Sequence, residues 1–435
     1  MRRATWLRTA FAALVLAASC SPAASHDAPQ PPAAPATAQP PVEATPTASA
    51  VPGIVGGGTP AISASPAIDV RTVEAPWTQA LDAVASGPRV SVAVGVNDMI
   101  VYTHAGAIGR IPASGQKLLT SIAALEVFGP SHRFSTVAAA ASRPREGVLR
   151  DDLWLIGGGD PELGALRVGT LAHRLVDAGL RRIAGSVVGD TSAFSRRWWA
   201  PGWVEGLSRR YVRRPTALTF EGNLVDAPEL AAATALSDAL RARGVIVDGS
   251  ARIGAAPRRA GELAHVGSAP LRELLVRQNH SSLNLHAEVL LRALGAARDT
   301  PTTAGGADVV EEVAAGAGYD VRVRDGSGLS HGDEVSAVEL TSLLLLAASE
   351  PWGPALEASL PGPGAGTIRG RLTGLAVRAK TGTLFTVPCS ALAGYVRDVD
   401  GTRIAFAVLS DGIAKRSSIA IEDAVVRVLA TSQVG

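Results

Sequence analysis

The sequence predicts an α+β fold in which one mixed sheet is packed by helices and a separate β-rich module is inserted. Strand-like runs occur near both ends of the chain, at 90–104 and 377–409, and stretches with helical periodicity lie between them. From 136 to 264 the character changes, because short β-like runs alternate there with Gly and Pro. A chain of 435 residues with 47% hydrophobic composition can fill the cores of two domains.

The first residues have the layout of a secretory signal peptide, which we expect to span 1–19. Three arginines precede an apolar run at 11–18 and small residues follow it. That run is shorter than the about 20 residues that a membrane-spanning helix needs. We therefore expect export from the cytoplasm.

The stretch Leu16-Ala17-Ala18-Ser19-Cys20 resembles a bacterial lipobox, in which the cysteine is lipidated and becomes the mature N-terminus. Simple cleavage nearby is the alternative. Residues 20–66 are rich in Pro and Ala and poor in large apolar residues, so they predict a disordered tether. With a lipidated Cys20, this tether would hold the folded part away from a membrane.

The folded part is expected to begin with a helix and a β-hairpin. The periodicity of Trp77–Val84 predicts the helix, and Val90–Val96 predicts a buried strand in which Gly95 marks a bulge. Asn97-Asp98 then turns the chain into a second strand, Met99–His104.

Later elements follow from the same patterns. The expected strands are Leu153–Ile156, Ser186–Val188, Val377–Lys380, Ser390–Val396 and Arg403–Leu409, and the expected helices are Leu271–Val276, Leu283–Leu294, Ala337–Ala348 and Ile419–Leu429. The expected division is a signal peptide at 1–19, a tether at 20–66, a catalytic domain made of 67–135 and 265–435, and an inserted domain at 136–264.

Charge and metal-ligand spacing exclude several classes of function. The formal net charge of +2 comes from interspersed residues, so the chain lacks the basic patch of a nucleic-acid-binding protein. The chain has no C-x-x-C pair and no H-E-x-x-H helix, and His280 and His286 are spaced too far apart for one helix face. We expect neither a metal nor another cofactor. Cys20 and Cys389 are the only cysteines, and no structural disulfide is expected.

Lysine is scarce in this chain. Only three of the 41 basic residues are lysines, namely Lys117, Lys380 and Lys415. Two of them lie in the short motifs Ser114-Gly115-Gln116-Lys117 and Lys380-Thr381-Gly382. A compact ammonium group can lose its proton, which a guanidinium group cannot do in a protein. This contrast indicates acyl-transfer chemistry on a serine.

Ser114 is expected at the start of a helix, because Pro112 precedes it and apolar residues then recur at three- and four-residue spacing. Residues i and i+3 share a helix face, so Ser114 and Lys117 can meet. A neutral Lys117 could take the Ser114 proton if its pKa falls from the usual value of about 10.4. Burial and a second cation such as Lys380 would both lower that pKa. Alone, S-x-x-K is short enough to arise by chance.

The Lys380-Thr381-Gly382-Thr383 stretch follows a strand-like run. Its side chains could alternate across a sheet edge, where Gly382 would let a substrate backbone approach and an extended peptide could add alongside. The alternative is a surface turn with an incidental lysine.

The Ser282-Leu283-Asn284 stretch lies between the two lysine motifs. Asn284 could hold Lys117 and a substrate amide, while Ser282 could relay a proton to the leaving group. For this short pattern alone, a helix N-cap serine is the favoured interpretation.

In this order, the three motifs resemble those of the active-site serine penicillin-binding proteins and β-lactamases. From about residue 70 onward the chain resembles one branch in particular, the serine D-alanyl-D-alanine carboxypeptidases of the low-molecular-weight class C type. The stretches that carry this likeness are Pro112-Ala113-Ser114, Leu155-Ile156-Gly157-Gly158-Gly159-Asp160-Pro161, Gly189-Asp190, Asp325-Gly326-Ser327-Gly328-Leu329-Ser330, Ala379-Lys380-Thr381-Gly382-Thr383-Leu384 and Ser390-Ala391-Leu392-Ala393-Gly394-Tyr395.

The resemblance implies a β-lactamase/transpeptidase-like α/β sandwich, an antiparallel sheet flanked by helices. It also implies the site: catalytic Ser114 (nucleophile), Lys117 (base), Ser282 and Asn284, and substrate-binding Lys380, Thr381, Gly382 and Thr383. The lysine and threonines would hold the terminal D-Ala carboxylate. Backbone N–H groups of Ser114 and Thr383 would form the oxyanion hole.

The implied function is a D-alanyl-D-alanine carboxypeptidase, with endopeptidase activity as an extension, that acts on peptidoglycan stem peptides and binds β-lactams covalently. The family often has Asp where this chain has Leu283, and the stretch between Ser114 and Ser282 leaves room for one inserted domain rather than two. A β-lactamase-like hydrolase and a catalytically silent wall-binding protein are the alternatives.

Overall fold

The computed structural model describes residues 69–204 and 211–435. The expected signal peptide, the lipobox Cys20 and the whole expected tether fall within residues 1–68 and so lie outside the described residues. Within the described ranges, no helix combines the length and apolar character needed to cross a membrane.

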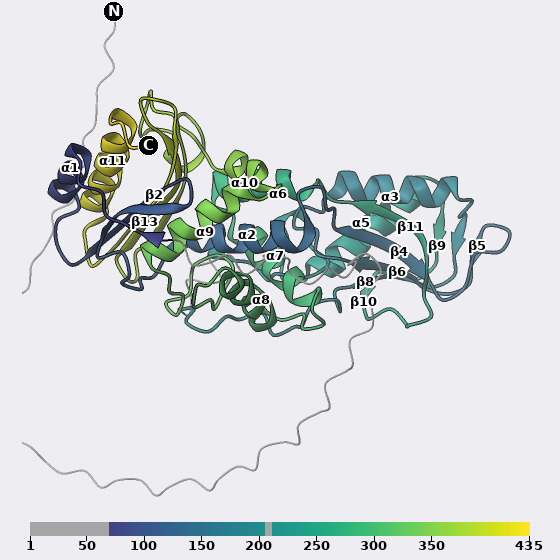
Figure 1. The fold of residues 1–435 in the computed structure, drawn as a ribbon. Helices are drawn as coiled ribbons and strands as arrows, with labels where there is room; N and C mark the ends of the chain where they lie inside the picture. Colours follow the sequence, from purple (N-terminus) through teal and green to yellow (C-terminus); the bar gives the residue numbers. More distant parts are fainter. Residues whose placement is uncertain (1–68, 205–210) are drawn as a thin grey trace, which may run out of the picture. The chain divides into compact units, whose positions relative to one another are not determined.

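The main sheet has six strands in the order β1-β3-β2-β14-β13-β12, so strands from the two ends of the chain lie side by side (Figure 1). All neighbours are antiparallel except β1 and β3. The strands are β1 (Asp69–Val70), β2 (Val90–Val96), β3 (Met99–His104), β12 (Val377–Leu384), β13 (Cys389–Arg397) and β14 (Arg403–Asp411). The predicted mixed sheet is therefore confirmed, and its register shifts between Val94 and Gly95, where the sequence predicts a bulge.

The helices and short 3-10 turns that accompany this sheet come mainly from the middle of the chain. They are α1 (Pro76–Val84), η1 (Ala113–Gly115), α2 (Gln116–Phe128), α6 (Leu271–Ser281), α7 (Asn284–Ala296), α8 (Thr303–Gly316), α9 (Ala337–Ser349), α10 (Gly353–Ser359), η3 (Gly366–Ile368) and α11 (Lys415–Thr431).

Helix α8 is not predicted by the sequence analysis, and its glycines explain why. Gly305 and Gly306 lower helix propensity by about 1 kcal/mol each relative to Ala. In the structure they allow close packing against α7, because a Cβ atom at Gly306 would collide with the Leu291 carbonyl oxygen. Packing between helices therefore overrides local propensity here.

The two faces of the main sheet are packed by separate hydrophobic clusters, since side chains alternate along each strand. On β14, Phe406 and Val408 join a cluster with residues of α1 and α11, whereas Ala405 and Ala407 join a larger cluster with α2, α6, α7, α8 and α9. Figure 1 shows α1 and α11 together on one side of the sheet and α9 on the other.

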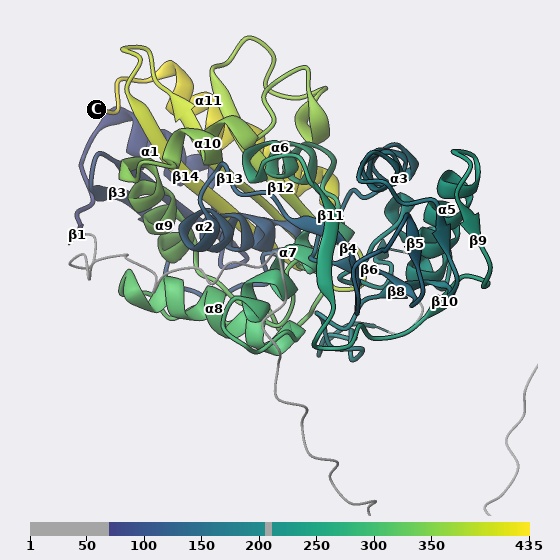
Figure 2. The same cartoon turned by 90° about the vertical axis from the view of Figure 1, so that its right-hand side faces the viewer.

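A second sheet is built from the chain between α2 and α6 and has the strand order β10-β8-β6-β4-β11 (Figure 2). Its strands are β4 (Ser135–Ala140), β6 (Leu153–Gly157), β8 (Val187–Asp190), β10 (Arg252–Ile253) and β11 (Gly261–Gly267), and beside them β5 (Val148–Leu149), β7 (Arg182–Ile183) and β9 (Ile246–Val247) form a small parallel sheet.

The second sheet has its own hydrophobic cluster, which includes residues of two helices that the sequence analysis does not predict. These are α3 (Ala165–Asp177) and α5 (Pro228–Arg241), and the 3-10 turn η2 (Glu221–Asn223) lies between them in the chain. Both helices lie beside the strands in Figure 2.

This architecture places the lysine motifs together. Strand β12 is the edge strand of the main sheet, and η1 packs on β12 and β13. Helices α6 and α7 contact α2, so the end of α6 and the start of α7 lie close to the first turn of α2.

Candidate active site

Ser114 and Lys117 meet at the junction of η1 and α2. Lys117 Nζ lies 3.0 Å from Ser114 Oγ and is its hydrogen-bond donor. The same ammonium donates to Asn284 Oδ1 at 2.8 Å and to the Ser327 carbonyl oxygen at 2.6 Å. The three-residue spacing thus brings the hydroxyl and the amine into direct contact.

Burial decides the protonation of the two lysines in the site. Lys117 is fully buried, and this lowers its pKa to about 8, although nearby carboxylates, chiefly Asp325, act in the opposite direction. Lys380 is also fully buried, and burial, together with repulsion from Lys117, places its pKa well below the usual value. Both lysines therefore have a lowered pKa, and burial is the main cause for each.

Strand β12 carries the Lys380-Thr381-Gly382-Thr383 motif. Lys380 Nζ donates to Ser282 Oγ at 3.1 Å and to the Thr381 carbonyl oxygen at 2.6 Å. Thr383 pairs in register with Ser390 of β13. The motif is therefore a strand edge and not a surface turn.

Ser282 and Asn284 occupy the junction between α6 and α7. Ser282 is the C-cap of α6 with a left-handed φ of 53°, so it is not the N-cap serine of the alternative interpretation, and Leu283 holds that position for α7. The Asn284 side chain accepts from Lys117 and donates through Nδ2 to the Tyr211 carbonyl oxygen at 2.9 Å. Its amide orientation is thereby fixed.

Gly382 lets β12 approach η1 closely. A Cβ atom at Gly382 would lie 2.5 Å from the Pro112 carbonyl oxygen and 3.0 Å from Gly115 N. No side chain fits in that space, so glycine at this position allows β12 to pack closely against η1 beside Ser114. Ala113, just before Ser114, adopts a φ of 47°, a left-handed conformation that is costly for a residue with a Cβ and is concentrated at functional sites.

The loop Asp325-Gly326-Ser327-Gly328-Leu329-Ser330 supports Lys117, a role that the sequence analysis does not assign. The Asp325 carboxylate accepts backbone N–H bonds from Gly328, Leu329 and Ser330 at 2.5 to 2.9 Å. A Cβ atom at Gly328 would collide with the Ala113 carbonyl oxygen, so the loop packs directly on the strained residue before Ser114. The dense Gly and Ser pattern is the signal in the sequence for this tight loop.

Glu288 of α7 is a second residue to which the sequence analysis assigns no role at the site. It is fully buried, and its Oε1 accepts the N–H groups of Gly326 at 3.0 Å and Ser327 at 2.8 Å. Burial and the Asp325 carboxylate raise the pKa of Glu288. Its acidic charge lies close enough to Lys117 to oppose the effect of burial there.

A cleft opens at Ser114, between the motif residues and a partly aromatic wall. Ser114, Ser282, Asn284 and Thr383 line one side, and the other lining residues include Trp203, Tyr211, Leu329, His331 and Phe385. Trp203 is fixed by its Nε1, which donates to Asp325 Oδ2 at 2.5 Å. Trp203 lies in the segment between the second sheet and α5, and the sequence offers no motif that would place it at the site.

Other polar residues singled out by the sequence take no part in the cleft. Among the described residues, no group of three or more His, Cys, Asp or Glu side chains is arranged to hold a metal ion. His286 is buried, which lowers its pKa to about 4. Cys389 is a buried free thiol whose pKa is raised by burial.

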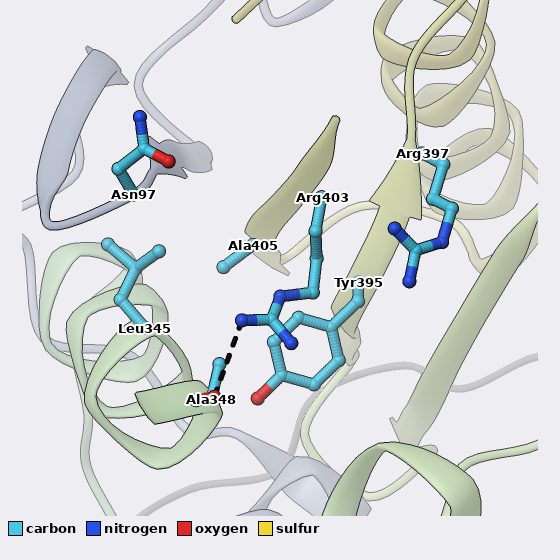
Figure 3. Close-up of a pocket in the computed structure, with 7 residues that line it drawn as sticks. All are labelled: Asn97, Leu345, Ala348, Tyr395, Arg397, Arg403 and Ala405. Carbon is cyan, nitrogen blue, oxygen red and sulfur yellow. Dashed lines mark hydrogen bonds between the residues drawn. The ribbon is translucent and has the colours of Figure 1, made fainter. Parts of the chain in front are cut away.

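A second hollow lies away from the motifs, between β14, β13 and the end of α9 (Figure 3). Arg403 lies over the Tyr395 ring and donates to the Ala348 carbonyl oxygen at 3.3 Å. Arg397 and Arg403 both lie near Glu357, so their charges are partly balanced. The Tyr395 hydroxyl is engaged with the Leu344 carbonyl oxygen at 2.8 Å, and none of the motif residues lines this hollow, so it is not a candidate catalytic site.

Comparisons with known proteins agree with the geometry. The chain is 31% identical over 422 residues to a D-alanyl-D-alanine carboxypeptidase of Actinomadura, covering 75% of this chain and 78% of the relative. The fold is similar to that of penicillin-binding protein 4 (dacB) from Haemophilus influenzae, with a TM-score of 0.72 and 22% identity over 82% of this chain and all of that chain.

The same Haemophilus protein complexed with a β-lactam aligns with a TM-score of 0.66 and 22% identity, over 82% of this chain and 99% of that chain. Residues 77–227 and 221–432 match the D-Ala-D-Ala carboxypeptidase 3 (S13) family. With the motifs in one cleft and the match covering most of the described chain, this protein belongs to the D-Ala-D-Ala carboxypeptidase 3 (S13) family.

Proposed function

We propose that this protein is a serine D-alanyl-D-alanine carboxypeptidase that acts on peptidoglycan stem peptides and is acylated by β-lactams on Ser114. The observation that carries the proposal is the contact between the fully buried Lys117 and Ser114 Oγ at 3.0 Å, in a cleft edged by β12. Membership of the family and the relative's printed name support the substrate.

In the proposed acylation step, neutral Lys117 takes the proton of Ser114 Oγ as that oxygen attacks the carbonyl carbon of the penultimate D-Ala. The backbone N–H groups of Ser114 and Thr383 stabilise the tetrahedral oxyanion, an effect worth about 3 to 4 kcal/mol per donor in serine hydrolases.

Collapse of this intermediate breaks the peptide bond. In the proposed step Ser282, which accepts a hydrogen bond from Lys380 at 3.1 Å, relays to the leaving amine of the terminal D-Ala the proton that Lys117 took from Ser114, so that both Ser282 and Lys117 return to their starting forms. Asn284 holds Lys117 and presents its amide to the substrate backbone. Water then attacks the ester on Ser114, which releases the shortened peptide and restores the serine.

The test combines intact-protein mass after incubation with a penicillin and measurement of D-Ala released from a stem pentapeptide. We expect a persistent adduct and D-Ala release for the wild type and for Ser131→Ala, an exposed serine beyond α2. Ser114→Ala should lose both. Penicillin turnover without an adduct would instead identify a β-lactamase-like hydrolase, and the absence of both adduct and turnover would identify a silent wall-binding protein.

The proposal also covers location. A peptidoglycan substrate requires action outside the cytoplasm, which agrees with the signal-like N-terminus. We propose that a lipidated Cys20 tethers the protein to a membrane through residues 20–66. An endopeptidase activity on cross-links would use the same Ser114 and the same cleft.

A further inference from the structure

The third lysine of the chain lies next to the motif on β12. Lys415 is the first residue of α11, and its Nζ donates to Thr383 Oγ1 and, at 3.0 Å, to Ser390 Oγ. Thr383 and Ser390 are direct partners across β12 and β13. All three lysines of a chain that otherwise uses arginine therefore lie within the substrate-binding region or beside it.

No carboxylate in the described parts of the chain lies within salt-bridge distance of Lys415 Nζ. Glu422 and Asp423 are the acidic residues of the same helix, and both are paired with Arg371 at 2.7 Å. Partial burial lowers the pKa of Lys415, while Glu422 acts in the opposite direction. An ammonium group has three donors, and two of them are used.

The hydroxyl groups beside Lys415 have no free proton of their own. Thr383 Oγ1 donates to the Gly382 carbonyl oxygen at 2.6 Å, and Ser390 Oγ donates to the Glu422 carboxylate. An anion that approaches Thr383 therefore needs a hydrogen-bond donor other than these two hydroxyl groups. The third N–H of the Lys415 ammonium is available for this.

Lys415 also borders a hollow that adjoins the catalytic cleft. It lines a hollow with Ser390 and Ser418, and this hollow shares Thr383, Leu384 and Phe385 with the cleft at Ser114. Phe385, which lines both hollows, is 78% exposed. The ammonium thus lies beside Thr383, a residue that also lines the cleft at Ser114.

We infer that Lys415 is a specificity-determining residue that supplies the positive charge for the free α-carboxylate next to the scissile bond, acting with Thr383. This inference rests on the proposed function. The carboxylate would receive one charge-assisted hydrogen bond from Lys415, either directly or through a Thr383 hydroxyl that turns from Gly382 to the substrate. Substrates without that carboxylate would gain nothing from Lys415.

The test compares two substrates that differ only at that group, an N-acylated peptide ending in D-Ala-D-Ala and the same peptide with a C-terminal carboxamide. The kcat/KM of each is measured by mass spectrometry of the released D-Ala or D-alaninamide. The variants are Lys415→Met, Lys415→Arg and, as matched control, Arg416→Met, which removes a charge from the next, exposed position of α11.

We expect Lys415→Met to lower kcat/KM for the peptide with the free carboxylate about 10- to 100-fold, as the loss of one charge-assisted hydrogen bond predicts. For the peptide with the carboxamide, kcat/KM should change by less than about twofold. Lys415→Arg should keep the preference for the acid, and Arg416→Met should match the wild type on both substrates. If Lys415→Met lowers kcat/KM equally for both substrates, Lys415 has a structural role. If it lowers kcat/KM for neither, Lys415 is not used in recognition. Either result overturns the inference.

A second measurement covers the case in which the methionine variant folds poorly. Acylation of Ser114 by a penicillin, which carries a carboxylate, is compared with acylation by a carboxylate-free p-nitrophenyl ester for Lys415→Met and for the milder Lys415→Gln. Slower penicillin acylation with an unchanged ester rate supports the inference, and equal rates for both reagents reject it. If the wild type reacts with neither reagent and neither peptide, the proposed function fails first.

Discussion

Lys117 can serve as a base in the proposed mechanism because two opposite effects set its pKa. Complete burial favours the neutral amine, and the carboxylates of Asp325, Glu288 and Asp333 favour the ammonium form. Together these effects give Lys117 a pKa of about 8. With that pKa, an appreciable fraction of the Lys117 side chains is neutral near physiological pH. A general base works best with a pKa close to the working pH.

The first prediction concerns the pH dependence of acylation. The neutral form of Lys117 is the active one, so kcat/KM should rise with pH through a pKa of about 8 and level off above it. The measurement is the rate of penicillin acylation between about pH 6 and pH 10, roughly two units on either side of that pKa. Lys117→Arg should abolish acylation at every pH, because a guanidinium stays charged.

A pH profile that stays flat over this range would contradict the assignment of Lys117 as the base. The same conclusion would follow if Lys117→Arg kept the wild-type rate.

At the scale of elements, β12 packs against η1, and this contact brings together the two segments of the proposed oxyanion hole. The sequence predicts a strand at Val377–Lys380 and the start of a helix at Ser114, but it cannot show that Gly382 faces Pro112 and Gly115. That contact joins two segments more than 260 residues apart in the chain, as the numbering shows. Local patterns carry no information about such a pair.

The second prediction is that Gly382→Ala lowers acylation about 100-fold or more, the effect of losing one oxyanion donor in other serine hydrolases. The added Cβ would lie 2.5 Å from the Pro112 carbonyl oxygen, so β12 must move away from η1. Acylation rates are compared with those of Gly370→Ala, whose Cβ would meet no atom within 4 Å. Equal rates for the two variants would mean that close approach of β12 and η1 is not required.

Much of the site could be predicted from the sequence because residues close together in the chain determine its local geometry. The spacing of Ser114 and Lys117 predicts their contact, and the Lys380 motif follows a recognisable strand. The wall of the cleft could not be predicted. Trp203 reaches the site through a hydrogen bond to Asp325, and α8 forms in spite of its paired glycines, because tertiary packing decides both.

At the scale of the whole molecule, the chain contains a part built on the main sheet, a part built on the second sheet, and the proposed tether. The main sheet unites the two ends of the folded part, and the second sheet, between α2 and α6, has its own core. The segment that follows the second sheet's strand β8 returns Trp203 to the cleft. Residues 20–66, outside the described part, are the proposed tether.

The third prediction concerns that tether. Cys20→Ser should move the full-length protein from the membrane fraction to the soluble fraction, because it removes the proposed lipid attachment point while leaving the domain from 69 onward unchanged. Fractionation followed by penicillin labelling measures both location and activity. Cys389→Ser is the control and should stay with the membranes. If Cys20→Ser remains equally membrane-bound, the protein is not a lipoprotein anchored at Cys20.

The distribution of lysine has a practical consequence for spectroscopy. Lys117 and Lys380 have no exposed surface, whereas Lys415 is only partly buried. Reductive methylation of the native protein with ¹³C-formaldehyde should therefore label the terminal amine and Lys415 first, and give a carbon spectrum of very few resonances. One of these signals would report directly on the region beside Thr383, without any engineered probe.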